Sequence, residues 1–264
     1  MTDGLIRTTD ETIYPAALVT GGARRIGREI VLELARMGFD IALHYKGSTE
    51  EAEETAAEVT DLGRRAVLFD ADLSDPTQGS ALVDGAIDAL GGLGVAVNNA
   101  SIFEEDNWQN ATAESWAAHM AVNLEAPLRI SQSLASHRKP GQNGIIVNLI
   151  DQRVFNLTPH FLSYTVSKSG LWTLTRTLAM ALAPDIRVMG IGPGPTEPSS
   201  RQSAESFQRQ VDIVPLRRRT RASDVAKTVR FIIESSNLTG QMIALDGGEH
   251  LGWRQDADGA YIPE

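Results

Sequence analysis

Seven short runs rich in β-branched and other apolar residues alternate along the chain with longer segments of helical pattern. The strand candidates are Ala16–Thr20, Ile41–His44, Ala66–Phe69, Val95–Val97, Ile145–Leu149, Arg187–Ile191 and Met242–Leu245. The segments between them are long enough for crossover helices, and strands joined in this way pair in parallel. The sequence therefore predicts an α/β fold with a single doubly wound parallel sheet of about seven strands, covered by helices on both faces.

Two of the intervening segments have a clear apolar helical face. The first is expected to stop at Gly38, because glycine readily adopts the conformation that ends a helix. The second begins near Ser163, carries leucines at helical spacing and ends before Pro184. By contrast, Gly192 to about Pro215 is rich in Pro, Ser and Gln. We expect a long lid or binding loop there.

The chain has 264 residues, of which 42% are hydrophobic, enough for the core of one large domain. We see no internal repeat or linker in residues 15–250, so that range is expected to form a single domain. Residues 1–14 are expected to be a flexible leader, and residues 251–264 a C-terminal tail.

Composition excludes several classes of function. The net charge of −10 argues against a nucleic-acid partner and against an anionic membrane surface. The absence of cysteine excludes disulfides and thiolate sites, and the five histidines show no paired metal spacing, so no metal is expected. The N-terminus has no apolar signal region, and no apolar run reaches membrane-spanning length. These features predict a cytoplasmic protein.

A glycine-containing turn, Thr20–Gly27, follows the first strand and opens the first helix. Glycines there allow backbone N–H groups to approach a pyrophosphate at the helix N-terminus, so the turn predicts nucleotide binding. The second strand ends without the acid that commonly binds the ribose of NAD, and it offers Lys46 and Ser48 instead. With Arg24, these residues could hold the 2′-phosphate of NADP. The alternative is that they are simply solvated charges.

Asp151, Tyr164 and Lys168 are the strongest catalytic candidates. The tyrosine and lysine are four residues apart and share one face of a helix. Asp151 follows an apolar strand and would face the start of that helix. A neighbouring lysine is expected to lower the pKa of the phenol, and the carboxyl group adds a second proton donor or acceptor. The three residues predict proton delivery beside a hydride.

Together these segments resemble the short-chain dehydrogenase/reductase family over nearly the whole chain, from about 15 to 250. The matching motifs are Thr20–Gly27, Asp72-Leu73, Asn98-Asn99-Ala100, Asn123, Tyr164 with Lys168, Gly192-Pro193-Gly194, and Gly240 with Asp246-Gly247-Gly248. The resemblance implies that residues 15–250 form a Rossmann-like, NADP-binding catalytic domain. It also implies an NAD(P)H-dependent oxidoreductase.

The resemblance assigns roles residue by residue. Residues implied to bind NADPH or NADP are Gly21, Arg24, Arg25, Ile26, Gly27, Tyr45, Lys46, Ser48, Asp72, Leu73, Asn99, Ala100, Ser101, Lys168, Pro193 and Gly194. Asp72 would contact the adenine, and the loop after Pro193 would cover the nicotinamide. Asn123 would hold a water in a proton relay, completing a catalytic set with Asp151, Tyr164 and Lys168.

Two residues depart from the family's commonest pattern. Arg25 replaces the middle glycine of the turn, and Asp151 replaces the serine expected thirteen residues before the tyrosine. Both features resemble the pteridine-reductase and dihydromonapterin-reductase branch, as do Ser101 and Phe103. The substrate site implied by that branch comprises Arg25, Ser101, Phe103, Asp151 and Tyr164. Phe103 would stack on one face of a pterin.

The chemistry of a pterin agrees with a carboxyl group at this position. A ketone reductase needs a neutral hydroxyl to hold the substrate oxygen, whereas a pterin is reduced at a C=N bond, where negative charge develops on nitrogen and a proton must arrive. The leading hypothesis is an NADPH-dependent reductase of a dihydropterin or dihydrofolate-type substrate. The alternatives are a carbonyl reductase for a 3-oxoacyl group or another ketone, and a non-catalytic NADP-binding sensor.

The expected partners are a small-molecule substrate and further copies of this chain, with no nucleic acid and no membrane. Family resemblance implies a homo-oligomer, either a dimer or a homotetramer. Its subunits would pack through the helices that carry Asn123 and Tyr164.

Overall fold

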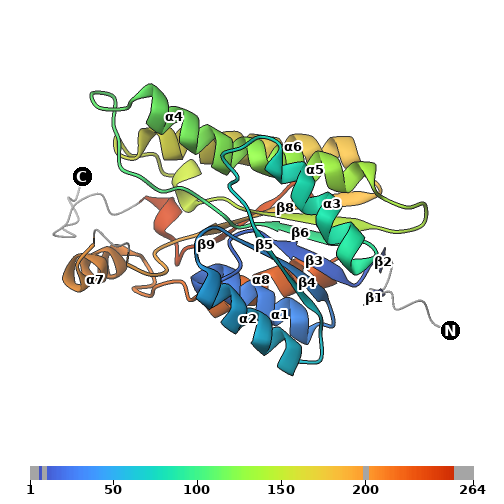
Figure 1. Ribbon diagram of the computed structural model, residues 1–264. Helices are drawn as coiled ribbons and strands as arrows, with labels where there is room; N and C mark the ends of the chain where they lie inside the picture. The colour runs from blue at the N-terminus through green and yellow to red at the C-terminus, as the bar shows by residue number, and fades with distance from the viewer. Residues whose placement is uncertain (1–5, 8–10, 199–201, 253–264) are drawn as a thin grey trace.

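The computed structural model describes residues 6–7, 11–198 and 202–252. Its centre is a seven-stranded, all-parallel sheet in the order β5-β4-β3-β6-β7-β8-β9 (Figure 1). The strands are β3 (Ala16–Val19), β4 (Asp40–Tyr45), β5 (Ala66–Asp70), β6 (Val95–Asn98), β7 (Gly144–Leu149), β8 (Ile186–Pro193) and β9 (Met242–Leu245). The predicted fold class is confirmed, and every strand candidate lies on an observed strand.

Helices cover both faces of the sheet (Figure 1). One face carries α1 (Arg25–Arg36), α2 (Thr49–Asp61) and α8 (Ala222–Glu234). The other face carries α3 (Gln78–Leu90), α4 (Ala113–Met120), the π-helical turn η1 (Ala121–Glu125), α5 (Ala126–Ser136) and α6 (Leu162–Leu182). Helix α1 ends before Gly38 and α6 before Pro184, as the sequence predicts.

Side chains of the central strands alternate between two buried clusters. On β3, Ala17 and Val19 pack with the α1, α2 and α8 layer, whereas Ala16 and Leu18 pack with the layer of α3 and α5. A strand buried on both faces needs an apolar residue at every position, which explains the near-continuous apolar runs in the sequence.

The order of the strands places the site. The chain starts in the middle of the sheet at β3, moves outward through β4 and β5, and then returns to β6 on the other side of β3. Loops after β3 and β6 therefore diverge at the carboxyl end of the sheet. Such a switch point leaves a crevice in which open α/β sheets bind ligands.

The sequence predicts one long loop from Gly192 to about Pro215. This prediction is wrong in part, because the segment contains helix α7 (Ala204–Ile213). Ser203 begins this helix, with its hydroxyl accepting a hydrogen bond from the Ser206 N–H at 3.1 Å. Phe207 and Val211, one helical turn apart, supply its buried side. This short amphipathic pattern is hidden among the Pro, Ser and Gln residues of the segment.

Part of the predicted leader packs against the domain. Of residues 1–14, residues 1–5 and 8–10 lie outside the described residues, and β1 (Ile6–Arg7) pairs with β2 (Thr12–Ile13). Ile13 is fully buried, and Glu11 forms an ion pair with Arg187 in which the carboxylate accepts from the guanidinium at 2.7 and 2.9 Å. In the predicted tail, residues 253–264 lie outside the described residues. Within the described part of the chain, no helix is long and apolar enough to cross a membrane.

Candidate active site

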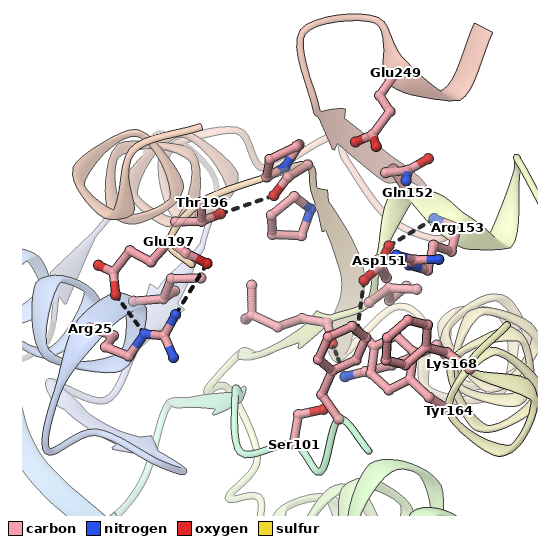
Figure 2. Close-up of a pocket in the computed structure, with 18 of the residues that line it drawn as sticks. Arg25, Ser101, Asp151, Gln152, Arg153, Tyr164, Lys168, Thr196, Glu197 and Glu249 are labelled. Carbon is pink, nitrogen blue, oxygen red and sulfur yellow. Dashed lines mark hydrogen bonds and ion pairs between the residues drawn. The ribbon is translucent and has the colours of Figure 1, made fainter. Parts of the chain in front are cut away.

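A cavity of about 420 Å³ opens at the carboxyl end of the sheet (Figure 2). Among the predicted site residues, those that line it are Arg25, Ile26, Asn99, Ser101, Phe103, Asp151, Tyr164, Lys168, Pro193 and Gly194. The remaining predicted residues, which belong to the glycine turn, the ends of β4, β5 and β6, and the π-helical turn, do not line it. They are Gly21, Arg24, Gly27, Tyr45, Lys46, Ser48, Asp72, Leu73, Ala100 and Asn123.

The catalytic candidates meet at the end of β7. The Tyr164 hydroxyl donates a hydrogen bond to Asp151 Oδ2 at 2.7 Å, while Asp151 Oδ1 accepts the Arg153 N–H at 2.8 Å. Asp151 therefore both contacts the phenol and caps the short helix η2 (Gln152–Val154). Lys168 Nζ donates to the Leu149 carbonyl at 2.8 Å and lies 5.7 Å from the centre of the Tyr164 ring.

The ionisation of Tyr164 differs from the sequence prediction. Burial, followed by the charge and hydrogen bond of Asp151, raises the pKa of Tyr164 well above its usual value. Lys168 does not lower it in this arrangement, because its ammonium bonds the Leu149 carbonyl and the carboxylate is the charge next to the hydroxyl. Burial lowers the pKa of Lys168 itself to about 8. The phenol is thus a protonated hydrogen-bond donor at neutral pH.

Asn123 is fully buried and holds the neighbouring loop in place. Its Oδ1 accepts from Ser101 Oγ at 3.1 Å and from the Ile102 N–H at 2.9 Å. Its Nδ2 donates to the Ile102 carbonyl and to Ser167 Oγ, both at 3.0 Å. These contacts engage both ends of the amide, so the side chain positions Ser101 at the cavity rather than facing the cavity itself.

The glycine turn is anchored to the neighbouring strands. The Gly21 N–H donates to His44 Nδ1 at 3.1 Å, so the other ring nitrogen carries the hydrogen and donates to the Ala71 carbonyl at 3.1 Å. Burial lowers the pKa of His44, which favours this neutral imidazole. Asn99 Nδ2 donates to the carbonyls of Thr20 and Gly21 at 2.9 and 3.0 Å. The turn is therefore held rigidly against β4 and β6.

The turn also fits the pyrophosphate of a dinucleotide. A side chain at Gly27 would collide with the Gly21 carbonyl oxygen, so the turn must stay this tight. Arg24, at the N-cap of α1, makes no side-chain capping hydrogen bond, so its side chain does not occupy the first N–H groups of the helix, where an anion could bind.

Arg25 occupies the turn with a left-handed backbone, at φ 53°. Glycine favours this conformation, and for an arginine it costs about 1–2 kcal/mol. The side chain is tied across the cavity, since its Nε donates to Glu197 Oε2 at 2.5 Å and its Nη2 contacts the Glu197 and Pro198 carbonyls at 3.4 Å. Figure 2 shows this ion pair bridging the turn and the loop after β8.

The three residues predicted to bind a 2′-phosphate are paired in part with acids. Lys46 Nζ donates to Asp72 Oδ2 at 2.7 Å, and Arg24 lies 4.0 Å from Glu51. Hydrogen bonds from Lys46 and then from Ser74 lower the pKa of Asp72 to about 2. Both cations remain largely exposed. Near them, Ser48 begins α2, Tyr45 ends β4, and Leu73 is buried after β5.

Phe103 already has an aromatic neighbour. Its ring stacks on Phe161 with centroids 4.3 Å apart and planes 5° from parallel, and it meets the edge of Tyr164 at 4.7 Å. The Arg153 guanidinium lies 5.0 Å from the Phe161 ring centre. Phe161 itself has a left-handed φ of 56° at the start of α6. The predicted aromatic platform is thus a pair of rings, with one face of Phe103 covered by Phe161.

Similarity to known proteins identifies the family of this chain. Residues 15–209 match the family model described as short chain dehydrogenase. The chain belongs to the short-chain dehydrogenase family. This confirms the predicted family and identifies the protein as an oxidoreductase.

Relatives of this short-chain dehydrogenase include solved structures and curated enzymes. It is 47% identical to the FolM alternative dihydrofolate reductase 1 of Brucella suis, solved in complex with NADP, with a TM-score of 0.88 over 91% of this chain and 96% of that one. A short-chain dehydrogenase of Burkholderia cenocepacia in complex with NADP is 33% identical, with a TM-score of 0.82 over 88% and 96%. The 3-oxoacyl-(acyl-carrier-protein) reductase FabG of Staphylococcus aureus is 30% identical over 89% of this chain and 98% of that protein. The NADP in these two structures agrees with the predicted cofactor.

The lining of this short-chain dehydrogenase cavity also includes residues that were not predicted, among them Gln152, Phe161, Glu197 and Glu249. The short helix η3 (Glu249–Leu251) presents Glu249 directly after the Asp246-Gly247-Gly248 motif. Asp246 holds this segment, because its carboxylate accepts from the N–H groups of Gly248 and His250 at 3.0 and 2.7 Å. The Asp246-Gly247-Gly248 motif could have predicted Glu249 as a site residue, because the residue after the motif lies at the carboxyl end of β9. Within the described residues, no group of three or more His, Asp and Glu side chains could hold a metal ion.

Proposed function

We propose that this short-chain dehydrogenase is an NADPH-dependent reductase of a C=N bond in a dihydropterin. The observation that carries the proposal is the 2.7 Å hydrogen bond between Tyr164 and Asp151 on the wall of the cavity. A carboxyl group placed there serves a reaction that must deliver a proton to nitrogen. Reduction of a ketone needs only the phenol.

The residues of the pair divide the work. Tyr164 Oη and Asp151 Oδ2 hold a proton between them, and a substrate nitrogen placed against the pair would receive it. The buried ammonium of Lys168 offsets the negative charge that the pair then retains. When bound, NADPH supplies the hydride to the carbon of the same C=N bond and is oxidised to NADP⁺. Hydride and proton together convert C=N to CH–NH.

The cofactor would be held by the glycine turn and the loops beside it. The N-terminus of α1 would bind the pyrophosphate, and Lys46 and Arg24 would meet the 2′-phosphate. Asn99, Pro193 and Gly194 border the part of the cavity next to the catalytic pair. Gly194 lies so close to Asp246 that a Cβ atom there would meet the Asp246 Cα at 2.8 Å, so this close approach of the two backbones requires glycine.

A flat heteroaromatic substrate suits the aromatic wall beside Tyr164. Phe103 and Phe161 form a stacked pair there, and Tyr164 adds an edge. Aromatic stacking contributes about 0.5–1.5 kcal/mol beyond burial of area. The 47% identity to a FolM dihydrofolate reductase supports a pterin ring as the substrate. We infer that Arg25 and Ser101 bind the polar edge of that ring.

A second candidate function is reduction of a ketone such as a 3-oxoacyl group. The FabG relative favours it, because that enzyme is similar over nearly the whole of both chains. Asp151 argues against it. The phenol alone can supply the proton that a ketone oxygen needs, so that reaction gives the carboxyl group no role.

The test is substrate-dependent oxidation of NADPH, followed by absorbance, against dihydropterins, dihydrofolate, ketones and quinones. Turnover of dihydropterins with little turnover of ketones supports the proposal. The reverse ranking would establish the ketone reductase instead. A non-catalytic NADP-binding sensor would oxidise NADPH with none of them.

A further inference from the structure

Two buried hydrogen-bond acceptors in the cavity have no donor. Glu249 Oε2 and Gln152 Oε1 are buried, without a hydrogen-bond partner, and both residues line the cavity. A buried acceptor that has lost water and gained no donor is unfavourable, and native structures keep few of them. Two such atoms on one ligand-sized cavity indicate that a ligand supplies the donors.

The surrounding segments fix Glu249 in this place. Asp246 holds the turn before it, and Asn156 Nδ2 donates to the Glu249 carbonyl at 3.4 Å, joining η3 to the loop after η2. The charges that act on the carboxyl group are those of Asp151, Arg153 and Asp246, and the Gln210 side chain contributes a hydrogen bond to it. Burial and then Asp151 raise the pKa of Glu249 to about 7, so a substantial fraction is ionised at neutral pH.

The two acceptors lie where the side chain of a dihydropterin substrate would extend. In Figure 2, Arg25 lies across the cavity from Asp151 and Ser101 lies below it, while Gln152 and Glu249 lie beyond Asp151 on the side away from Ser101. In a dihydropterin, the carbon of the reducible C=N bond is also the carbon that bears the side chain. With the ring edge at Arg25 and Ser101 and the reactive nitrogen at Asp151, the side chain extends toward Glu249.

We propose that Glu249 and Gln152 determine specificity by binding hydroxyl groups on the substrate's side chain and rejecting an anionic one. Hydroxyls supply the donors that both acceptors lack. The side chain of dihydrofolate ends in carboxylates, which an ionised Glu249 beside Asp151 repels. The inference rests on the proposed function. In it, Glu249 and Gln152 determine which pterins the enzyme reduces.

Arg153 does not cancel that repulsion. Its guanidinium packs over the Phe161 ring, its Nη1 donates to Thr158 Oγ1 at 3.2 Å, and its backbone N–H binds Asp151. The effect of Asp151 on the pKa of Glu249 is larger than the opposing effect of Arg153. The end of the cavity at Glu249 therefore favours neutral donors.

The experiment compares kcat/KM for a dihydropterin with a hydroxylated propyl side chain and for dihydrofolate. Wild-type enzyme should favour the hydroxylated substrate by about tenfold or more, the effect of one hydrogen bond to a charged group. Glu249→Gln keeps an acceptor and removes the charge, so kcat/KM for dihydrofolate should rise. Glu249→Leu removes both, so KM for the hydroxylated substrate should rise about tenfold to a hundredfold with kcat largely kept.

Glu205→Gln is the matched control, because it removes one exposed negative charge from α7 outside the cavity lining and should leave the ratio unchanged. Circular dichroism confirms that each variant is folded, and quenching of protein fluorescence by an oxidised pterin with the same side chain reports binding without turnover. If the wild-type enzyme reduces dihydropterins and neither Glu249 variant changes the ratio, this inference is wrong and the proposed function stands. If the wild-type enzyme reduces no dihydropterin, the proposed function fails and this inference with it.

Discussion

At the scale of single residues, the site depends on buried ionisable groups that are paired rather than isolated. Asp151 uses one oxygen to cap η2 and the other to accept the Tyr164 hydroxyl. Two readings of this residue, a turn cap or a catalytic acid, therefore describe the same side chain. The Lys168 ammonium donates its hydrogen bond to a backbone carbonyl rather than to Asp151 or Tyr164. It therefore acts on that pair through its charge and not through a hydrogen bond.

We expect Lys168 to set the alkaline limit of activity. Its pKa is lowered by burial to about 8, so the ammonium is charged below that pH and neutral above it. Because the neutral amine cannot offset charge on the pair, kcat should decline as the pH rises through about 8. A pH–rate profile with saturating NADPH measures this. A kcat that stays constant from neutral pH to well above 8 would show that Lys168 acts only by binding.

Glu249 should cost stability at high pH. Its folded-state pKa is raised to about 7 from an ordinary 4.5, so the folded state holds the proton more tightly than the unfolded chain does. Stability then falls as the pH rises from 4.5 to 7, by on the order of 3 kcal/mol. Glu249→Gln should leave stability nearly unchanged at pH 4.5 and raise it at pH 8. Urea unfolding at both values measures the difference, and an equal effect at both would contradict the assignment.

At the scale of elements, the ends of β3, β4, β6 and β7 bring together residues that are far apart in sequence. The strand runs could be predicted because buried parallel strands are apolar at every position. The Phe103–Phe161 stack could not, because it depends on a left-handed backbone at Phe161. The ion pair between Arg25 and Glu197 could not be predicted either, because the conformation of the folded loop after β8 sets the distance between them.

The end of β4 should select NADPH over NADH. Lys46 and Arg24 are largely exposed there, and charge-assisted contacts to a 2′-phosphate are worth roughly 1.5–3 kcal/mol each. The ion pair with Asp72 must be shared or exchanged, so we expect a preference of about tenfold or more rather than the sum of both contacts. Titration of both cofactors by fluorescence measures the two affinities.

Lys46→Asp should narrow or reverse the preference, whereas Lys139→Asp, an equal change of charge at an exposed residue after α5, should not. Equal affinity of the wild-type enzyme for the two cofactors would count against a phosphate site at β4. The two cations would then be solvated surface charges.

At the scale of the whole molecule, apolar side chains remain exposed on the helices predicted to join subunits. Trp116 on α4 and Val166 and Met180 on α6 are 41, 43 and 76% exposed. We expect these helices to pack against a second copy of the chain, because exposed apolar patches mark interaction surfaces. Light scattering after size exclusion should give a dimer or tetramer.

Met180→Glu should shift that mass toward the monomer, because it places a charge in the predicted contact. Leu62→Glu makes the same kind of change at the end of α2, where Leu62 is 42% exposed, and should leave the mass unchanged. If the wild-type protein is monomeric, or if Met180→Glu does not change its mass, α6 is not part of a subunit interface.

The central claim is that Asp151 and Tyr164 together deliver a proton to a pterin nitrogen, and the kcat of Asp151→Asn with a dihydropterin tests it most directly. Asparagine can still cap η2 but cannot supply a proton, so the fold and the affinity for NADPH should persist. We predict that kcat with a dihydropterin falls by about 10²–10⁴-fold. Near-full activity would contradict the account, and would leave Asp151 as the cap of η2 alone.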